Sequence, residues 1–233
     1  YFRAVADRSP LPVLLYNIPR CVPYAIPVPI ITELAHHPNI IGIKDSSGNM
    51  DRMCATLNAV KSTPKRSVTV TPVFEAVTAR MLRPVAQNVE PATFVSAETL
   101  GSGISIASAP PVPALRTREK EVGFQVLTGS ASIVFDALQA GASGGILGFA
   151  ACTPQACTEV YLAWKDHDLV LAREKQERVR KPNQRIVGQI GVAGVKYACD
   201  FNGYYGGHAR VPLLRLTAEE KTEIESMLAE IRN

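Results

Sequence analysis

Short, continuous apolar runs that alternate with helix-length segments constrain the fold of this 233-residue chain more than any other feature. The runs at 11–17 (LPVLLYN) and 40–45 (IIGIKD) have the length and composition of strands that are buried on both faces. The segment 28–37 between them has room for about two to three helical turns. Strands that alternate with helices pair in parallel through right-handed crossovers, which predicts a doubly wound sheet or a (β/α) barrel.

The alternation resumes further along the chain. A third apolar run at 124–127 leads into Thr128-Gly129-Ser130, which is a helix-start signal ahead of residues 131–140. The Gly-rich stretch 141–149 is predicted to be the next strand, and Thr153-Pro154 opens a helix in the favoured order of cap and then proline. The remaining sequence is predicted to be mostly helical, with helices at 156–165, 168–180, 194–202 and 218–232.

The segment 67–122 interrupts this pattern. It is rich in Val, Ala, Thr, Ser and Pro, and it shows no sustained helical or strand period. A structureless insertion of this length is unusual inside a compact domain. Two explanations stay open, a long surface excursion or translated non-coding sequence in a faulty gene model. We expect an atypical, unpacked insertion.

Composition and charge narrow the functional classes. With 46% hydrophobic and 20% charged residues, the chain has an ordinary globular composition. A net charge of +4, with basic residues clustered on only one helix face, argues against nucleic-acid binding. No apolar run reaches the roughly 18 residues of a membrane span. The five cysteines form no CxxC pair, which suits a reducing compartment, so we expect an intracellular protein, mitochondrial or cytoplasmic.

Lys44 follows four apolar residues near the end of the run 40–45, where a charged side chain is unexpected. A free lysine side chain has a pKa of about 10.4. Desolvation at this position would lower that pKa and provide a neutral, nucleophilic amine. Position alone also allows a lysine that pairs with Asp45 or extends its amine into solvent at a barrel mouth. These alternatives stay open at this point.

Tyr16 lies near the end of the preceding strand, and neighbouring strands are only about 4.8 Å apart. Ligands bind at the carboxyl ends of parallel strands, so we expect Tyr16 and Lys44 to point into one pocket. A phenol there can shuttle the protons that imine formation and aldol chemistry require. The alternative is a tyrosine that caps the core with its hydroxyl in water.

Thr128, Gly129 and Ser130 fall at a third strand end. Their hydroxyls and backbone N–H groups are suited to hold a carboxylate at a helix N-terminus, although ordinary helix capping uses the same residue types. The four histidines have no metal-ligand spacing, and the stretch 141–148 lacks the pattern of a phosphate loop. The sequence therefore predicts no metal and no bound cofactor.

Five separated motifs resemble the dihydrodipicolinate synthase and N-acetylneuraminate lyase superfamily. They are LLYNIP at 14–19, IIGIKDSSG at 40–48, FQVLTGSA at 124–131, GASGGILG at 141–148 and GYYGGHARVPL at 203–213. Their order and their residue types both match. Within the superfamily the sequence is most similar to 4-hydroxy-2-oxoglutarate aldolase, through its KDS, FQVL-x-GSA and FGYYGG-like segments. The resemblance covers residues 1–66 and 123–233.

The resemblance implies a class I, metal-independent lyase on a (β/α)8 TIM barrel with extra C-terminal helices, usually assembled as a homotetramer. It matches Lys44 to the Schiff-base lysine and Tyr16 to the proton-shuttling tyrosine of a Y-N-x-P motif. Ser46 matches a serine that lines the aldolase pocket, and Gly129 a glycine close to the bound oxo acid. The implied reaction cleaves 4-hydroxy-2-oxoglutarate into pyruvate and glyoxylate. The alternatives are dihydrodipicolinate synthase and another 2-keto-3-deoxy acid aldolase.

Two departures qualify the resemblance. Dihydrodipicolinate synthases typically have an arginine two places after the motif's proline, where this chain has Cys21 and carries Arg20 one place earlier. This difference argues against lysine biosynthesis. The family's first four βα units, with the loop that grips the substrate carboxylate, have no counterpart here. We therefore expect the C-terminal half of a barrel, about four βα units, at 1–66 and 123–165, followed by a helical region at 166–233.

Half a barrel exposes open sheet edges and an apolar face, so the chain alone is expected to fold poorly or associate, and to be inactive. A hypothesis of a different class follows from this expectation. The chain is then a truncated, non-catalytic fragment or an interaction subunit that retains the sequence of an enzyme by descent.

Overall fold

The computed structural model describes residues 1–70 and 118–231, and the chain divides into two compact units. Unit 1 holds residues 1–66 and 121–233, and unit 2 holds residues 67–120. The elements in chain order are α1 (Phe2–Arg8), β1 (Val13–Asn17), α2 (Val28–Leu34), β2 (Ile40–Asp45), α3 (Met50–Ala59), β3 (Arg66–Val70), β4 (Arg118–Val122), β5 (Gln125–Thr128), η2 (Ala131–Ile133), α4 (Val134–Gln139), β6 (Gly144–Gly145), η3 (Phe149–Ala151), α5 (Pro154–Lys165), α6 (Leu169–Asn183), η4 (Gln184–Ile190), α7 (Val192–Phe201) and α8 (Ala218–Ala229).

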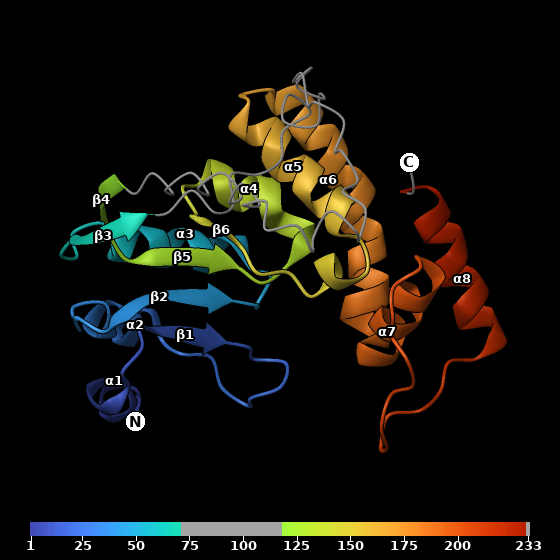
Figure 1. The fold of residues 1–233 in the computed structure, drawn as a ribbon, viewed down its shortest axis with the longest axis horizontal. Coiled ribbons are helices and arrows are strands. Elements are labelled where there is room, and N and C mark those ends of the chain that lie inside the picture. Colours follow the sequence, from blue (N-terminus) through green and yellow to red (C-terminus); the bar gives the residue numbers. More distant parts are fainter. Residues whose placement is uncertain (71–117, 232–233) are drawn as a thin grey trace, which may run out of the picture. The chain divides into compact units, whose positions relative to one another are not determined.

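Four parallel strands form the sheet of unit 1, in the order β1-β2-β5-β6 (Figure 1). In this register Lys44 of β2 lies opposite Tyr16 of β1 and Leu127 of β5. Helix α2 connects β1 to β2, and helix α4 lies between β5 and β6, which is the parallel arrangement that the alternating apolar runs predict. The predicted α/β fold with a parallel sheet is therefore confirmed.

The two faces of this sheet differ in burial. Leu15, Ile43 and Val126 are at most 1% exposed, and they pack in one core with residues of α2, α3 and α4. Alternate residues of a strand point to opposite faces, so Tyr16 and Lys44 lie on the other face, where Tyr16 is 45% exposed. The prediction that these strands are buried on both faces is therefore wrong for β1 and β2. Tyr16 and Lys44 lie outside the core that the helices cover.

The last strand is shorter than its Gly-rich sequence predicts. β6 comprises Gly144 and Gly145 alone, instead of the whole stretch 141–149. Gly141, three residues before β6, has a φ angle of +103°, which lies outside regular strand geometry, so the strand begins later than predicted. The chain then enters the 3-10 helix η3, which buries Phe149 completely.

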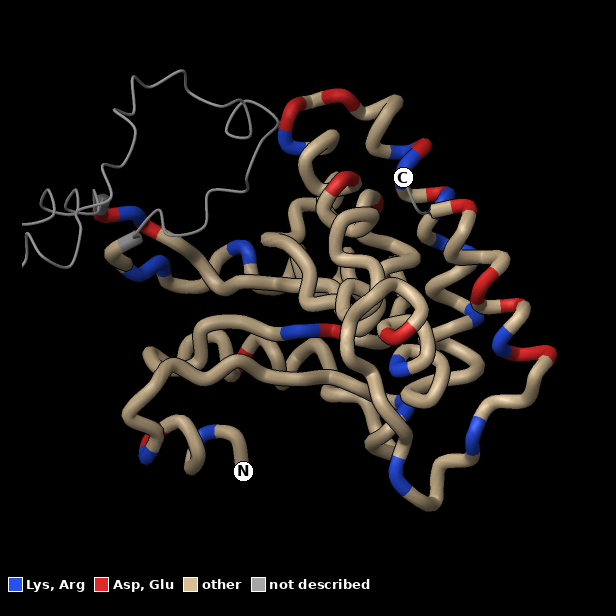
Figure 2. Tube along the Cα trace, turned by 45° about the vertical axis from the view of Figure 1, so that its right-hand side comes forward, with Lys and Arg blue, Asp and Glu red and all other residues tan. Residues whose placement is uncertain are grey.

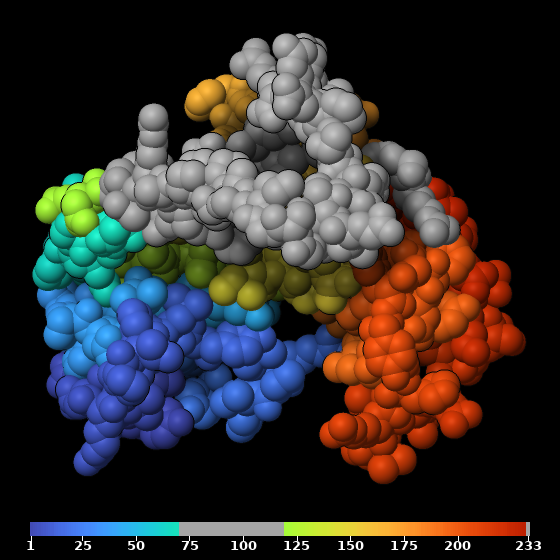
Figure 3. Space-filling view, in the orientation of Figure 1, coloured from blue at the N-terminus to red at the C-terminus, as the bar shows by residue number. Residues whose placement is uncertain are grey.

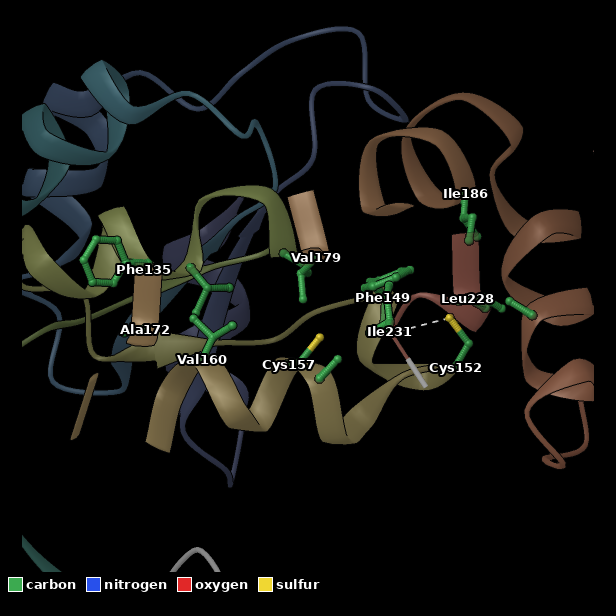
Figure 4. Packing of buried hydrophobic residues seen from close by; sticks show 14 of the residues in the cluster. Phe135, Phe149, Cys152, Cys157, Val160, Ala172, Val179, Ile186, Leu228 and Ile231 are labelled. Atoms are coloured by element: carbon green, nitrogen blue, oxygen red, sulfur yellow. Dashed lines mark hydrogen bonds between the residues drawn. The ribbon is translucent and has the colours of Figure 1, made fainter. Parts of the chain in front are cut away.

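Helices α5 to α8 and the π-helix η4 build a second core around Phe149, Cys152 and Cys157 (Figure 4). The predicted C-terminal helices are confirmed with shifted ends, and the one predicted at 168–180 extends to Asn183. Burial raises the pKa of the Cys152 thiol to about 12 and that of the Cys157 thiol to about 11. Charges of both signs are interspersed along the outer helices (Figure 2). In the described part of the chain, no helix has the length and apolar character to cross a membrane.

The segment 67–122, predicted to be an atypical insertion, has regular structure at both of its ends. β3 and β4 form a two-stranded sheet. Within unit 2, the carboxylate of Glu119 accepts hydrogen bonds from Ser67 Oγ at 2.8 Å and from Thr69 Oγ1 at 2.6 Å. Neither strand contains a continuous apolar run, so the sequence pattern does not indicate them. The remainder of the predicted insertion lies outside the described residues.

The loop between α7 and α8 projects at the lower edge of the view in Figures 1 and 3. Asp200 Oδ1 holds this loop by accepting hydrogen bonds from the N–H groups of Gly206 at 2.7 Å and Gly207 at 3.2 Å. These bonds lower the pKa of the Asp200 carboxyl below its ordinary value. Tyr205 and Val211, by contrast, are 95% and 91% exposed.

Candidate active site

The carboxyl ends of the strands are level with one another, because the hydrogen-bond ladders continue one residue past each strand. The N–H of Ser46 donates to Asn17 O at 2.8 Å, and the N–H of Gly129 donates to Asp45 O at 2.6 Å. These bonds bring the last residues of β1, β2 and β5 to one edge of the sheet. This edge is where parallel α/β folds bind ligands.

Lys44 and Tyr16 are in direct contact at this edge. The Lys44 Nζ atom lies 4.2 Å from the centroid of the Tyr16 ring, over its face. The contact follows from the register, since opposed residues on neighbouring parallel strands leave the sheet on the same side. A cation over a tyrosine ring is an attractive arrangement. The two residues expected to share a pocket are thus brought together.

Asp45 has a different partner from Lys44. Its side chain is 2% exposed on the opposite face of the sheet, where Asp45 Oδ2 accepts a hydrogen bond from Arg52 Nε at 2.7 Å. Asp45 Oδ1 accepts a second bond from the N–H of Ser47 at 2.8 Å. The alternative in which Lys44 pairs with Asp45 therefore does not describe this structure.

Ser46 and Gly129 lie against each other at the ends of β2 and β5. A Cβ atom built on Gly129 would approach Ser46 Cβ to 2.8 Å and Ser46 Cα to 2.9 Å, and it would overlap the Ser46 hydroxyl. The side chain of Ser46 thus occupies the space that any larger residue at 129 would need. This packing explains a glycine here without any requirement for unusual backbone angles.

Thr128 is fully buried, and its hydroxyl serves the local turn. Thr128 Oγ1 accepts a hydrogen bond from the N–H of Ser130 at 3.2 Å and lies 3.3 Å from Ser130 O, to which it donates. The hydroxyl predicted to bind substrate is therefore engaged with the start of η2. Helix-start geometry, the alternative interpretation of the sequence, describes Thr128.

Arg52 and Asn17 support the strand ends from the helix side of the sheet, although the sequence singled out neither as functional. Arg52 lies in the first turn of α3, whose N-cap residue Asn49 accepts a bond from the Arg52 N–H at 2.9 Å. Arg52 also donates to Ile26 O at 2.5 Å, and Asn17 Oδ1 accepts a bond from the Ile26 N–H at 3.0 Å. An Asp directly after the lysine and an Arg seven residues later, at a helix start, is the pattern that could have indicated this network.

No group of three or more His, Cys, Asp or Glu side chains within residues 1–70 and 118–231 is arranged to hold a metal ion. His37 contacts Asp7 through Nε2 at 2.9 Å, and its Nδ1 accepts a bond from the Asn39 N–H. His36 lies 2.9 Å from Thr32 O through Nδ1. Both side chains therefore have local partners on the helix side of unit 1.

Comparison with known protein families shows which family the chain belongs to. The model of the dihydrodipicolinate synthetase family matches residues 1–82 and 113–231. The chain belongs to this family. The superfamily resemblance carried by the five sequence motifs is thereby confirmed, while the finer assignment to 4-hydroxy-2-oxoglutarate aldolase stays a prediction.

Relatives with two different named activities match most of the chain. An L-threo-3-deoxy-hexylosonate aldolase from Aspergillus niger is 25% identical over 224 residues, which are 94% of this chain and 55% of that protein. A 4-hydroxy-tetrahydrodipicolinate synthase from Gluconacetobacter diazotrophicus is 22% identical over 228 residues, which are 98% of this chain and 57% of the synthase.

Solved structures of the same family share the fold. A dihydrodipicolinate synthase from Bacillus anthracis gives a TM-score of 0.69 at 20% identity, covering 100% of this chain and 59% of the other. A prophage family member from E. coli K12, in complex with pyruvate, gives 0.68 at 21% identity, covering 100% of this chain and 60% of the other. This chain therefore spans between 55% and 60% of the length of all four relatives.

Proposed function

We propose that this chain carries the Schiff-base lysine of a lyase that cleaves or forms a C–C bond in a 2-oxo acid. Lys44 is the amine that condenses with the C2 ketone, and Tyr16 is the residue that moves protons at the same centre. The single observation that carries the proposal is the position of the Lys44 Nζ atom, 4.2 Å from the Tyr16 ring centroid at the carboxyl edge of a parallel sheet. Family membership supports the same chemistry.

The proposed reaction begins when the Lys44 ammonium gives up a proton and the resulting amine attacks the C2 carbonyl carbon. Loss of water from the carbinolamine forms an iminium, and a phenol close to the amine is suited to supply the proton that this loss requires. The iminium then accepts the electron pair of the breaking C3–C4 bond while the C4 hydroxyl loses its proton to a base. Protonation of the resulting enamine at C3, followed by hydrolysis, releases pyruvate and the free lysine.

Ser46 and Gly129 are proposed to border the bound oxo acid. Both lie two residues beyond the level of Lys44 and its opposite residues, at the edge from which the amine would receive substrate. Their mutual packing leaves this border without a bulky side chain at 129. We assign Thr128 the supporting role of shaping the turn that presents Gly129, because its hydroxyl is bonded to Ser130.

The proposed substrate is 4-hydroxy-2-oxoglutarate, cleaved to pyruvate and glyoxylate. The sequence motifs favour it, and Cys21 replaces the arginine that is typical of dihydrodipicolinate synthases. Arg20, one place earlier, donates to Val187 O at 2.7 Å and so has a structural partner. The names of the relatives support two alternatives equally well, a 4-hydroxy-tetrahydrodipicolinate synthase and a 3-deoxy-hexylosonate aldolase. Assembly into a homo-oligomer belongs to the same proposal.

Borohydride trapping tests the Schiff base. The chain is incubated with pyruvate and sodium borohydride, and the modified peptide is located by mass spectrometry. We expect one reduced pyruvate adduct, on Lys44, and none in a Lys44→Ala variant. Lys61→Ala is the matched control, because Lys61 is an exposed lysine bonded to Asn58 Oδ1 on the far end of α3. A folded chain that gains no adduct on Lys44 would contradict the proposal and favour a non-catalytic fragment or interaction subunit.

A second assay separates the candidate substrates. Pyruvate release is followed with a coupled dehydrogenase from 4-hydroxy-2-oxoglutarate and from a 2-keto-3-deoxy hexonic acid, and consumption of aspartate semialdehyde is followed with pyruvate. We expect the highest kcat/KM with 4-hydroxy-2-oxoglutarate. A preference for one of the other two would keep the Schiff-base chemistry and replace the substrate.

A further inference from the structure

We propose that Arg52 is a positioning residue that sets the contact between Tyr16 and Lys44. It does so through a hydrogen-bonded network, the Arg52 clamp, made of the side chains of Asn17, Arg52 and Asp45 and the backbone of Ile26. The proposed catalytic role of Lys44 and Tyr16 is assumed here, and the clamp adds the means by which their geometry is held. The residues of the clamp do not face the substrate edge themselves.

The first arm of the clamp joins α3 to the end of β2. Arg52 Nε donates to Asp45 Oδ2 at 2.7 Å, with the two side chains 17% and 2% exposed. Asp45 is held from its other oxygen by the N–H of Ser47. A buried carboxylate that keeps a charged partner and a backbone donor is satisfied, whereas loss of the partner would leave a buried charge.

The second arm joins α3 to the end of β1. Arg52 Nη2 donates to Ile26 O at 2.5 Å, and the Ile26 N–H donates to Asn17 Oδ1 at 3.0 Å. Both backbone polar groups of one buried residue, Ile26, are therefore bound by side chains. The loop that leaves β1 after Asn17 is closed back onto Asn17 by this pair of bonds. Arg52 thus reaches the two strands that carry the proposed catalytic pair.

The clamp influences the substrate face because its residues are the sequence neighbours of Tyr16 and Lys44. Asn17 directly follows Tyr16, and Asp45 directly follows Lys44. Asn17 and Asp45 are 1% and 2% exposed on the helix side, so Tyr16 and Lys44 must leave the opposite side. Fixing the two buried side chains fixes the rotation of each strand end about its own axis. The 4.2 Å approach of Lys44 Nζ to the Tyr16 ring depends on that rotation.

Arginine is the residue that this position requires. One guanidinium supplies donors in a fixed fork, and here one nitrogen serves Asp45 while another serves Ile26 O. A lysine ammonium could keep the charge beside Asp45, but its single nitrogen has no rigid second arm to reach the carbonyl. Arg52→Lys therefore tests the link between the two strands with less disturbance of charge, and Arg52→Gln removes both the charge and the link.

The test compares these variants with Arg185→Gln. Arg185 makes a bidentate ion pair with Glu223 at 2.7 to 2.9 Å, between η4 and α8. It is thus a matched arginine–carboxylate pair outside the sheet. Protein with ¹³C-labelled lysine is used, and the Lys44 ε-methylene resonance is assigned by its loss in Lys44→Arg. The Tyr16 ring centroid lies 4.2 Å from Lys44 Nζ, so we expect the ring to displace the resonance of the adjacent ε-methylene from those of solvent-exposed lysines. Urea midpoints report the stability of every variant.

We expect Arg52→Lys and Arg52→Gln to return the Lys44 resonance toward the exposed position, while Arg185→Gln leaves it displaced. In the borohydride assay, we expect both Arg52 variants to trap pyruvate about tenfold to a hundredfold more slowly at saturating pyruvate, with the rate of Arg185→Gln unchanged. An unchanged Lys44 resonance in folded Arg52→Lys and Arg52→Gln overturns the inference. So does a trapping rate that falls only in proportion to the unfolded fraction.

The two proposals fail in different ways. If wild-type protein gains no adduct yet its Lys44 resonance moves in the Arg52 variants, the clamp stands and the catalytic assignment falls. If wild-type protein is trapped on Lys44 and the Arg52 variants match it in rate and resonance, the catalytic assignment stands and the clamp falls. If Arg52→Gln does not fold, the Lys44 resonance and the trapping rate of Arg52→Lys alone still separate the clamp from the catalytic assignment.

Discussion

Replacement of Gly129 by alanine tests the close packing between the ends of β2 and β5. Gly129 has no left-handed backbone angle, so the effect of an added methyl group is steric. The new Cβ would lie 2.8 Å from Ser46 Cβ and 2.9 Å from Ser46 Cα, where ordinary van der Waals contact begins at 3.4 Å. Rotation of the Ser46 hydroxyl cannot relieve a clash with the Ser46 Cα, so the backbone of one strand end must move.

The expected loss follows from that geometry. Overpacking by one methyl group costs typically 1–3 kcal/mol, and a clash with backbone belongs at about the upper end, roughly 3 kcal/mol. A domain is stable by about 5–15 kcal/mol, so the change is a large fraction of the total. With a urea m-value of about 2 kcal/mol per molar, the midpoint of unfolding falls by about 1.5 M.

Urea unfolding monitored by far-UV circular dichroism measures this loss, with Gly123→Ala as the control. A Cβ at Gly123 meets nothing within 4 Å, so this variant is expected to be as stable as the wild type or slightly more stable. The double variant Ser46→Gly with Gly129→Ala should recover part of the loss, because two of the three close atoms disappear. A midpoint for Gly129→Ala equal to that of Gly123→Ala would refute the steric argument.

Two further predictions concern groups outside the sheet edge. The pKa of Asp200 is lowered by its bonds to Gly206 and Gly207, so its stabilisation of the loop is present above the ordinary carboxyl pKa and is lost as pH falls through the depressed value. The protection factors for amide hydrogen exchange at Gly206 and Gly207 should fall in that acid range, and at neutral pH they should be lower in Asp200→Asn than in the wild type. Unchanged protection factors would contradict the prediction. Gln176 is fully buried and bonded to the backbone of η2 and α4, so Gln176→Ala should lose about 2–3 kcal/mol in urea unfolding, and a loss no larger than that of the exposed Gln155→Ala would contradict it.

The sequence predicted the sheet and the pairing of Tyr16 with Lys44 because both depend on local pattern. An apolar run of strand length specifies a strand, and a polar residue at its end specifies the edge on which that side chain lies. Two such side chains on adjacent parallel strands then meet if the strands pair in the right register, and in the β1–β2 pairing Tyr16 lies opposite Lys44. The C-terminal helices were predictable for the same reason, since their apolar spacing is continuous.

The missed features depend on contacts and backbone angles that the local sequence pattern does not specify. Arg52 looks like an ordinary polar residue in the first turn of a helix, and its function in the structure comes from Ile26, which lies 26 positions earlier. The late start of β6 depends on the backbone angle of Gly141, which a Gly-rich sequence permits without specifying. The burial of Thr128 likewise depends on its turn, because a threonine at a strand end can face either the substrate or its own helix start.

The contacts that hold the proposed catalytic amine are local in the chain, and this separates two steps of the proposed reaction. Tyr16, the Arg52 clamp and Lys44 all lie between residues 16 and 52, and Gly129 is added from the position directly after β5. Imine formation requires the amine, its proton partner and room for a carbonyl, so trapping on Lys44 depends mainly on these residues. Selection of the aldehyde requires groups that touch the far end of the substrate, and the chain spans 55% to 60% of its compared relatives. Pyruvate trapping and turnover of the candidate substrates can therefore give different results. If the chain traps pyruvate but turns over none of these substrates, imine formation depends on the residues named here and aldehyde selection depends on other groups.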